Sequence, residues 1–289
     1  MYCDFFGLNQ KPFGITPDTS LFYGGGQRGA ILNSLIYAIA QGEGIIKVVG
    51  EVGSGKTMLC RMLPTQLPDN IQLVYLQNPS LTPDILPFVI AHELGLSVNN
   101  NSTKLEILQV LQNHLLHCHS KNRQVVVFVE EAQSMPIETL EEIRLLSNLE
   151  TDHKKLLQLV LFAQPELDKT LANPSIRQLK ERITYNVNLH PFGIEDIESY
   201  LSFRLNISGY NGPTLFTRKV CRTIDKYSKG LTRRINILAD KALLSAYIEG
   251  RQHLTQKDVK IAARDSEYTS NIPFSLLIDI LTTRTKDKV

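Results

Sequence analysis

The chain has 289 residues, which suits one large domain or two of ordinary size, because folded units usually run to about 100 to 200 residues. Hydrophobic residues make up 43% and charged residues 21%, and these values exclude a disordered, collagen-like or coiled-coil chain. The 31 lysines and arginines against 29 aspartates and glutamates leave a net charge of +2. That balance gives no electrostatic case for a general binder of nucleic acid or anionic membranes.

The four cysteines are scattered singly, without the paired spacing of a zinc site or the density of a disulfide scaffold, and they indicate a reducing compartment. No signal-peptide pattern opens the sequence. The longest apolar stretch near the carboxyl end of the sequence is residues 272–281. It falls well short of the roughly 20 residues that span a bilayer. We therefore expect a cytoplasmic protein without a membrane span, whose contact with the inner membrane, if any, is peripheral and runs through a partner.

From residue 45 onwards, short apolar runs alternate with segments whose apolar residues recur every three or four positions. The runs in the middle of the chain are apolar on both faces, which is typical of a parallel sheet covered by helices. Thr103 with Glu106 forms a capping-box pattern, and Pro83 and Pro136 stand where a first helical residue would lie. The predicted strands are residues 45–49, 72–76, 125–129, 157–162 and 185–189.

After Pro191 the strand pattern ends and only amphipathic segments follow, with Gly230 and Gly250 at predicted helix ends. We therefore predict an α/β domain at residues 1–190, an all-helical domain at 191–266 and a tail at 267–289. The predicted helices of the second domain are residues 194–207, 217–229 and 233–249, with a fourth from residue 255.

The first predicted strand runs into Gly50-Glu51-Val52-Gly53-Ser54-Gly55-Lys56-Thr57, which fits GxxxxGK[ST], and Met58 continues into a predicted helix. The glycines let the backbone curl so that successive N–H groups point inwards and cradle phosphates. Lys56 would reach the β and γ phosphates, and the Thr57 hydroxyl would bind Mg²⁺. We therefore predict that residues 50–58 bind ATP, with Mg²⁺ as the cofactor.

Two acids, Glu130 and Glu131, follow the third predicted strand. That end of a strand lies at the edge of the sheet where ligands bind in open α/β proteins. In ATPases of this type the first acid orders Mg²⁺ through water and the second polarises the attacking water as general base. We assign those roles to Glu130 and Glu131; the alternative is a pair of solvated acids that opens a loop.

With these motifs the chain resembles the AAA+ ATPases of the ExeA and MshM secretion family, which serve general secretion and mannose-sensitive haemagglutinin (MSHA) pili. The resemblance covers most of the chain and implies a P-loop AAA+ αβα sandwich with a five-stranded parallel sheet and a carboxyl-terminal helical lid domain. It depends on the order and spacing of short motifs, which are Phe6-Gly7-Leu8, Lys11-Pro12-Phe13, Thr16-Pro17-Asp18, Glu131-Ala132-Gln133, Gln164-Pro165-Glu166-Leu167, Arg177-Gln178-Leu179 and Gly230-Leu231-Thr232-Arg233.

The resemblance also implies further site residues. Gln164 matches the sensor 1 residue between the γ phosphate and the attacking water, although a helix-capping amide is the alternative. Arg182 matches the finger that such ATPases insert into the neighbouring subunit's site, with Arg177 as the runner-up and a surface salt bridge as the alternative. Arg233 matches the sensor 2 arginine, with Arg234 as its competitor.

The resemblance further implies that the segment around residues 13–18 lies near adenine, although Phe13 could equally be a core anchor.

Glu130 departs from the family pattern, which usually has aspartate there. The extra methylene extends the carboxylate by roughly 1.5 Å, and Mg²⁺ demands near-ideal octahedral geometry. We therefore expect slow hydrolysis.

His114 and Cys118 share a helix face but have no second ligand group nearby in sequence, so we interpret them as an ordinary helix end. Lys154 and Lys155 are interpreted as a solvated face.

These expectations combine into a Mg²⁺-dependent, oligomerising AAA+ ATPase that supports assembly of a bacterial type II secretion or type IV (MSHA-like) pilus machine. Its partners would be other copies of itself, through Arg182 in trans, and machine proteins at the inner membrane, whereas nucleic acid is not expected. One alternative is a DNA-associated AAA+ regulator resembling transposition helper ATPases. The other is a nucleotide-gated scaffold with slow hydrolysis, which Glu130 suggests.

Overall fold

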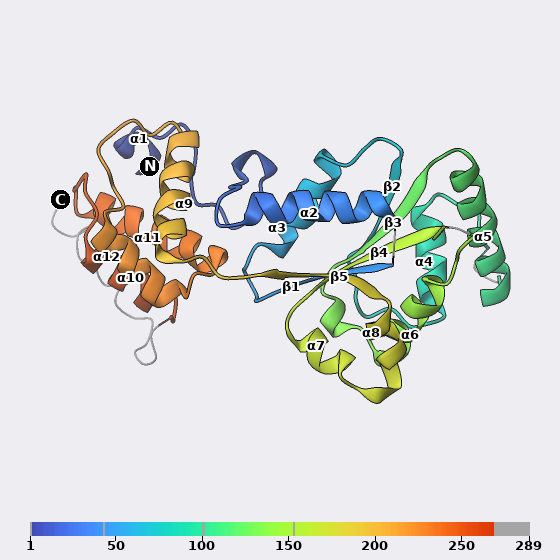
Figure 1. The fold of residues 1–289 in the computed structure, drawn as a ribbon. Coiled ribbons are helices and arrows are strands. Elements are labelled where there is room, and N and C mark those ends of the chain that lie inside the picture. Colours follow the sequence, from blue (N-terminus) through green and yellow to red (C-terminus); the bar gives the residue numbers. More distant parts are fainter. Residues whose placement is uncertain (1, 43, 100–101, 153, 269–289) are drawn as a thin grey trace. The chain divides into compact units, whose positions relative to one another are not determined.

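The computed structural model describes residues 2–42, 44–99, 102–152 and 154–268. The chain divides into two compact units, which we treat separately. Gln27–His190 form the α/β unit, and Met1–Gly26 together with Pro191–Val289 form the helical unit. Figure 1 labels their elements.

The α/β unit is built on a five-stranded sheet in the order β2-β3-β4-β1-β5, with every neighbouring pair parallel (Figure 1). All residues of β1 and β4 are buried, as expected for strands covered on both faces. The five predicted strands are confirmed, with bounds that shift by one or two residues. They are β1 (Ile45–Gly50), β2 (Ile71–Leu76), β3 (Gln124–Val129), β4 (Leu157–Ala163) and β5 (Ile183–Leu189).

Helices cover both faces of this sheet, because alternate side chains of each strand point to opposite faces. One face, which includes Val127 and Leu159, shares a buried cluster with side chains from the later helices of the unit. Those helices are α4 (Ile85–Glu93), α5 (Lys104–Ser120), α6 (Ile137–Leu146), α7 (Glu166–Leu171) and α8 (Arg177–Glu181). The other face meets α2 (Arg28–Gln41) and α3 (Lys56–Met62), which gives the expected αβα sandwich (Figure 1).

The helix ends follow their sequence signals with one difference. The capping box is present: the Glu106 N–H donates to Thr103 Oγ1 at 3.3 Å, and the Thr103 N–H donates to Glu106 Oε2 at 2.7 Å. The two prolines lie just outside their helices, since α4 begins at Ile85 and α6 at Ile137. A proline fits the turn before a helix as well as its first residue, because neither position needs its missing N–H.

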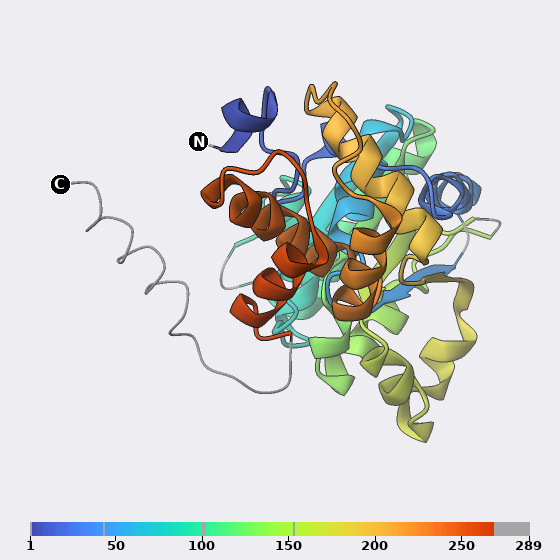
Figure 2. The ribbon, with the colours of Figure 1, turned by 90° about the vertical axis from the view of Figure 1, so that its left-hand side faces the viewer.

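The helical unit contains α9 (Ile194–Ile207), α10 (Arg218–Ser228), α11 (Thr232–Ile248) and α12 (Gln256–Asp265). The bounds of α9 agree with its prediction, and those of α10 and α11 shift by one residue. A short amino-terminal helix, α1 (Tyr2–Phe6), packs against α11 (Figure 2). The helical unit therefore takes one helix from the other end of the chain.

The first 26 residues differ from the predicted domain at 1–190, because they pack with the helical unit. Phe13 is 1% exposed and its ring lies 5.6 Å from that of Phe216, so it is a core anchor. The side chain of Arg204 donates to the Pro12 carbonyl at 2.7 Å, and that of Asn236 donates to the Gly14 carbonyl at 3.2 Å. The apolar residues of this segment have no helical or strand period, so the sequence did not indicate what they pack against.

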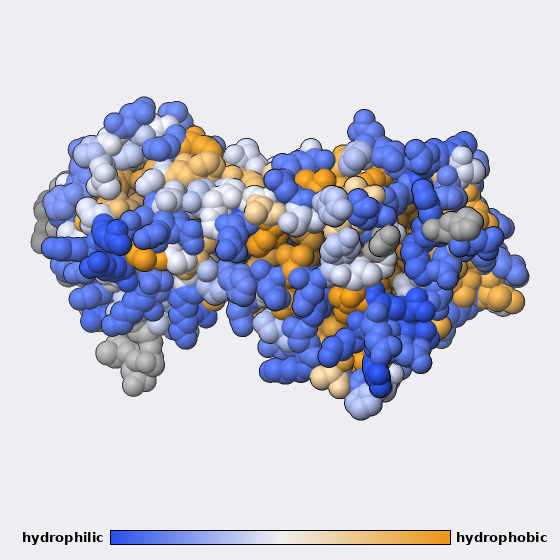
Figure 3. Space-filling model, in the orientation of Figure 1, coloured by the Kyte–Doolittle hydropathy of each residue, from blue (hydrophilic) through white to orange (hydrophobic). Residues whose placement is uncertain are grey.

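The division at Pro191 coincides with the predicted one. Most of the predicted tail, including the apolar residues 272–281, lies outside the described residues. None of the helices described combines the length and the apolar composition that crossing a bilayer requires. On the face shown in Figure 3 the surface is mostly hydrophilic, and hydrophobic side chains show only in scattered areas.

Candidate nucleotide-binding site

The predicted catalytic segments meet at one edge of the sheet. β3, β4 and β1 are consecutive neighbours and run parallel, so their carboxyl ends lie side by side. The P-loop follows β1, Glu130 and Glu131 follow β3, and Gln164 follows β4. The structure therefore places Gln164 just after the strand that lies between the P-loop strand and the strand of the two acids.

The P-loop backbone depends on its glycines. Gly53 and Gly55 have φ values of +79° and +107°, which L-residues with side chains rarely adopt. A Cβ on Gly50 would lie 2.6 Å from Ser54 Oγ, so the loop closes tightly on the end of the strand. Lys56 is only 7% exposed, and its ammonium donates to the carbonyls of Gly50 at 2.7 Å and Glu51 at 3.1 Å. The lysine thus lies inside the curl of the loop. This arrangement fits the phosphates of a nucleoside triphosphate.

Arg28 supports this loop and was not predicted from the sequence. It is the first residue of α2 and is 5% exposed. Its Nη2 donates to the Ser54 carbonyl at 3.1 Å and to the His190 carbonyl at 2.8 Å. The guanidinium therefore ties the P-loop backbone to the segment after β5. Only contacts across 26 and 162 residues of sequence reveal this role, so no local pattern signals it.

Glu131 is held by two side-chain amides. Its Oε2 accepts from Gln133 Nε2 at 2.7 Å and from Gln164 Nε2 at 2.9 Å. The oxygen of the Gln133 amide accepts from the backbone N–H of Gln164 at 2.9 Å, which fixes how the amide points. Glu131 also has a positive φ of +53°, an uncommon conformation for a non-glycine residue. The general-base candidate and the sensor 1 candidate are therefore in direct contact.

Glu130 faces α3. The fully buried thiol of Cys60 lies near its carboxylate. Burial first, and then the charge of Glu130, hold the pKa of Cys60 well above its usual range. Burial, with the nearby Cys60 and Glu130, raises the pKa of Tyr75 to about 12. Cys60 lies one helical turn after Thr57 on α3.

Arg182, the first candidate for the finger, lies at the other edge of the sheet. Arg182 precedes β5 and is half-buried, so the α/β unit does not bring it to its own P-loop. Arg177 Nε lies 2.9 Å from Glu181 Oε1 in an exposed ion pair. In the helical unit, Arg233 and Arg234 both lie in the first turn of α11. Arg233 is exposed, whereas the guanidinium carbon of Arg234 lies 5.1 Å from the ring centroid of Tyr268.

The histidine cluster of α5 shows one pairwise contact. His114 Nε2 lies 3.3 Å from Cys118 Sγ. Burial, followed by the charges of His117 and Arg123, lowers the pKa of His114. Within the part of the chain that the structure describes, no group of three or more His, Cys, Asp or Glu side chains is arranged to hold a metal ion.

Comparisons with known proteins agree with this architecture. A family model described as an AAA domain matches residues 39–171. General secretion pathway protein A of Aeromonas hydrophila is 39% identical over 263 residues, which are 91% of this chain and 48% of that protein. The chain thus spans about half the length of this relative.

Solved structures with the same fold include Cdc6p of Pyrobaculum aerophilum, with a TM-score of 0.67 and 18% identity, covering 90% of this chain and 74% of that one. The Aeropyrum pernix ORC2 protein, solved in ADPNP–ADP complexes, has a TM-score of 0.66 and 17% identity, covering 89% and 73%. At such identity these structures establish the fold alone. The chain is therefore a P-loop protein of the AAA+ fold, related over nine tenths of its length to General secretion pathway protein A.

Proposed function

We propose that this chain binds ATP with Mg²⁺ and hydrolyses it, and that its subunits assemble side by side to support a bacterial secretion or pilus machine. The observation that carries the proposal is the contact between Glu131 and Gln164 at the edge of the sheet that holds the P-loop. A carboxylate beside a γ-phosphate sensor is the arrangement that a hydrolytic water needs.

The roles follow from the positions of the side chains. The P-loop N–H groups and Lys56 bind the phosphates, and Thr57 with Glu130 would hold Mg²⁺, which neutralises charge on the β and γ phosphates when bound. Glu131 accepts the proton of the attacking water. Gln164 orients that water, since its amide already lies 2.9 Å from the base.

Arg182 is proposed to act in trans. It lies at the amino edge of the sheet, whereas the P-loop lies at the carboxyl edge, so a second copy must bring the two together. Arg177 remains the runner-up. Its ion pair with Glu181 is exposed and therefore weak enough to break, which would free the guanidinium. Arg233, on the helical unit, is proposed as the sensor 2 arginine because Arg234 already stacks on Tyr268.

The relation to General secretion pathway protein A supports a role in secretion, and we extend the proposal to a type IV pilus. We propose a cytoplasmic protein that meets its machine at the inner membrane through a partner. That nucleic acid is not a partner stays a prediction, since the structural neighbours include the Aeropyrum pernix ORC1 protein in complex with DNA, at 18% identity. A scaffold that binds ATP and barely hydrolyses it is the rival that Glu130 supports.

The test is the rate of ATP hydrolysis per subunit, measured with Mg²⁺ against protein concentration. The parent rate is expected to rise cooperatively, and Arg182→Ala is expected to lose this rise while keeping ATP affinity. Lys180→Ala is the control, because it removes an exposed cation two residues away. Lys56→Ala is expected to abolish ATP binding, and micromolar affinity in that variant would refute the P-loop assignment. A parent rate near zero that Glu130→Asp restores would identify the scaffold.

A further inference from the structure

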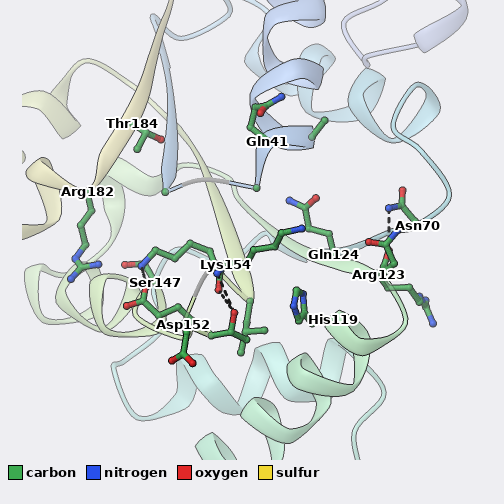
Figure 4. A pocket seen from close by; sticks show the side chains of 18 residues that line it. Gln41, Asn70, His119, Arg123, Gln124, Ser147, Asp152, Lys154, Arg182 and Thr184 are labelled. Atoms are coloured by element: carbon green, nitrogen blue, oxygen red, sulfur yellow. Dashed lines mark hydrogen bonds and ion pairs between the residues drawn. The ribbon is translucent and has the colours of Figure 1, made fainter.

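A pocket of about 940 Å³ opens at the amino edge of the sheet, away from the P-loop (Figure 4). Its lining comes from the segments that lead into all five strands, including Gly44, Asn70, Gln124, Leu156 and Thr184. Parallel strands begin at one edge and end at the other, so this pocket and the nucleotide site lie at opposite edges. The described lining contains none of the residues 50–58.

Cationic side chains dominate the charge of the pocket. Arg123, Lys154, Lys155 and Arg182 line it, against the carboxylates of Glu150 and Asp152. Lys155 pairs with Glu150, and this hydrogen bond, with a smaller contribution from Arg182, lowers the pKa of the Glu150 carboxyl. The described lining therefore holds four cationic side chains against two carboxylates. Figure 4 shows Arg182 and Arg123 at opposite sides of the pocket with Lys154 between them, and the guanidinium of Arg123 points away from the other two.

Local hydrogen bonds hold two parts of the wall in place. Glu150 and Lys155 form an antiparallel bridge, and the Lys154 N–H donates to Thr151 Oγ1 at 3.1 Å. This turn presents Lys154 at the pocket. On another side, the Gln124 amide donates to Gln158 Oε1 at 2.7 Å and to the Ile39 carbonyl at 2.9 Å. Part of the lining is thus set by contacts within the protein before any ligand arrives.

We propose that this pocket binds a small molecule carrying phosphate or pyrophosphate groups. Its volume lies within the range of about 300 to 1,000 Å³ of ligand sites. Guanidinium and ammonium groups that line one pocket suit a phosphate, which accepts hydrogen bonds from both. The only apolar side chains in the described lining are Ala40 and Leu156, so the wall offers little to a hydrophobic ligand.

Occupation of this pocket engages Arg182, the residue that the proposed function assigns to a neighbouring subunit. A bound phosphate compound and trans action by Arg182 would therefore exclude one another. The pocket itself does not depend on hydrolysis, and its test leaves Arg182 unchanged and removes phosphate binding at the P-loop.

The test is isothermal titration of the full chain carrying Lys56→Ala with inorganic pyrophosphate at physiological ionic strength. Lys56→Ala removes phosphate binding at the P-loop. One saturable site is expected, and adding Arg123→Ala with Lys154→Ala is expected to weaken binding at least about tenfold. Lys121→Ala is the matched control, because this exposed lysine is two residues from Arg123 but does not line the pocket. Its affinity should equal that of the Lys56→Ala background.

Absence of saturable binding would overturn the proposal, as would binding that the double substitution leaves unchanged. A second titration uses a single-stranded oligonucleotide. If the oligonucleotide binds more tightly than pyrophosphate and loses its affinity in the double variant, the cations serve a nucleic-acid backbone and the small-ligand proposal fails. Weaker or absent oligonucleotide binding, together with the expected pyrophosphate result, supports the pocket as a small-molecule site.

Discussion

The contact between Cys60 and Glu130 gives the longer acid a partner. The resemblance places aspartate at position 130, and the extra methylene of glutamate extends the carboxylate. In the structure that carboxylate lies near a fully buried thiol on α3. A neighbour that orients a metal-binding carboxylate affects metal affinity even though it does not touch the metal. Cys60 therefore belongs to the proposed Mg²⁺ site as a positioning residue.

We expect Cys60→Ala to raise the Mg²⁺ concentration needed for half-maximal ATP binding by about tenfold, because loss of such a second partner typically costs that much metal affinity. Cys60→Ser retains a donor and should restore most of it. Fluorescent ATP titrations at a series of Mg²⁺ concentrations measure the effect. Cys221→Ala is the matched control, since this equally buried thiol lies in the helical unit and donates to the Phe216 carbonyl. An unchanged Mg²⁺ requirement in Cys60→Ala would remove its positioning role.

Gln133 is expected to act on hydrolysis through Glu131. Gln133→Leu removes an amide that donates to the Glu131 carboxylate at 2.7 Å and accepts from the backbone of Gln164 at 2.9 Å. Misplacing a general base lowers the chemical step without removing phosphate contacts. We therefore expect kcat to fall by about tenfold while KM for ATP stays within about twofold. Steady-state kinetics at saturating Mg²⁺ decide this, and a KM that rises while kcat is kept would contradict it.

The roles of Cys60 and Arg28 show what the sequence could not supply at this scale. Glu131 and Gln164 stand at strand ends, where a motif and a resemblance indicated them. Arg28 contacts Ser54 and His190 across long sequence separations, and its burial depends on the folded loop. Such residues carry no local pattern, because their function is defined by what the fold brings beside them.

At the scale of elements, the sequence was most informative where periodicity is strong. The middle strands and α9 were predicted to within a residue because their apolar pattern is continuous or strongly amphipathic. β5 was predicted two residues short, because its early residues are half-buried or exposed and give a weaker apolar signal. The short helices α7 and α8 were not predicted, since five or six residues are too few to show a helical period.

The start of α12 depends on a buried carboxylate. Asp258 is fully buried and accepts from Arg251 Nη2 at 2.7 Å, from the Thr255 N–H at 2.8 Å and from Ser245 Oγ at 2.9 Å. Burial alone would raise the pKa of Asp258, but the hydrogen bonds, that of Arg251 foremost, lower it below its usual value. A depressed pKa means that the stabilisation is present above the unfolded-state pKa of about 3.9 and is lost as the pH falls through the lower, folded-state pKa.

We therefore expect Asp258→Asn to lower the free energy of unfolding by about 2 to 3 kcal/mol at pH 7, because it leaves Arg251 without its buried charge partner. The difference from the parent should stay constant between pH 7 and pH 5 and shrink only below about pH 4. Urea unfolding at several pH values measures it. Glu249→Gln is the control: Glu249 also pairs with Arg251 but is exposed, so its effect should stay within about 0.5 kcal/mol. A difference that fades between pH 7 and pH 5 would assign the effect to another group.

At the scale of the whole molecule, the parallel topology of the sheet places the P-loop and the cationic pocket at opposite edges. Every strand ends at the edge that carries the P-loop, Glu131 and Gln164, and begins at the edge that carries the cationic pocket. The first edge was predicted because its motifs follow strands directly. The second was not, since its cations come from segments that are far apart in sequence, and Lys154 with Lys155 were interpreted as a solvated face.

The helical unit likewise joins both ends of the chain, and this arrangement predicts where a core substitution acts. Phe13 is buried against Phe216, and its neighbours Pro12 and Gly14 bind side chains of α9 and α11. Phe13→Ala should therefore cost about 3 to 5 kcal/mol within the helical unit, although residue 13 lies in the predicted α/β domain. Hydrogen exchange is expected to lose protection in α9 to α12 while β1 to β5 keep theirs.

Phe162→Ala supplies the reverse case. Phe162 is as buried as Phe13 but lies on β4, with its ring 5.6 Å from that of Phe128. The same loss of aromatic volume should then reduce protection in the strands and spare α9 to α12. If Phe13→Ala instead exposes β1 to β5, the first 26 residues belong energetically to the α/β unit as the sequence predicted. If each substitution acts on its own unit, residues 1–26 are a structural part of the helical unit, and the amino terminus contributes to its stability from the opposite end of the chain.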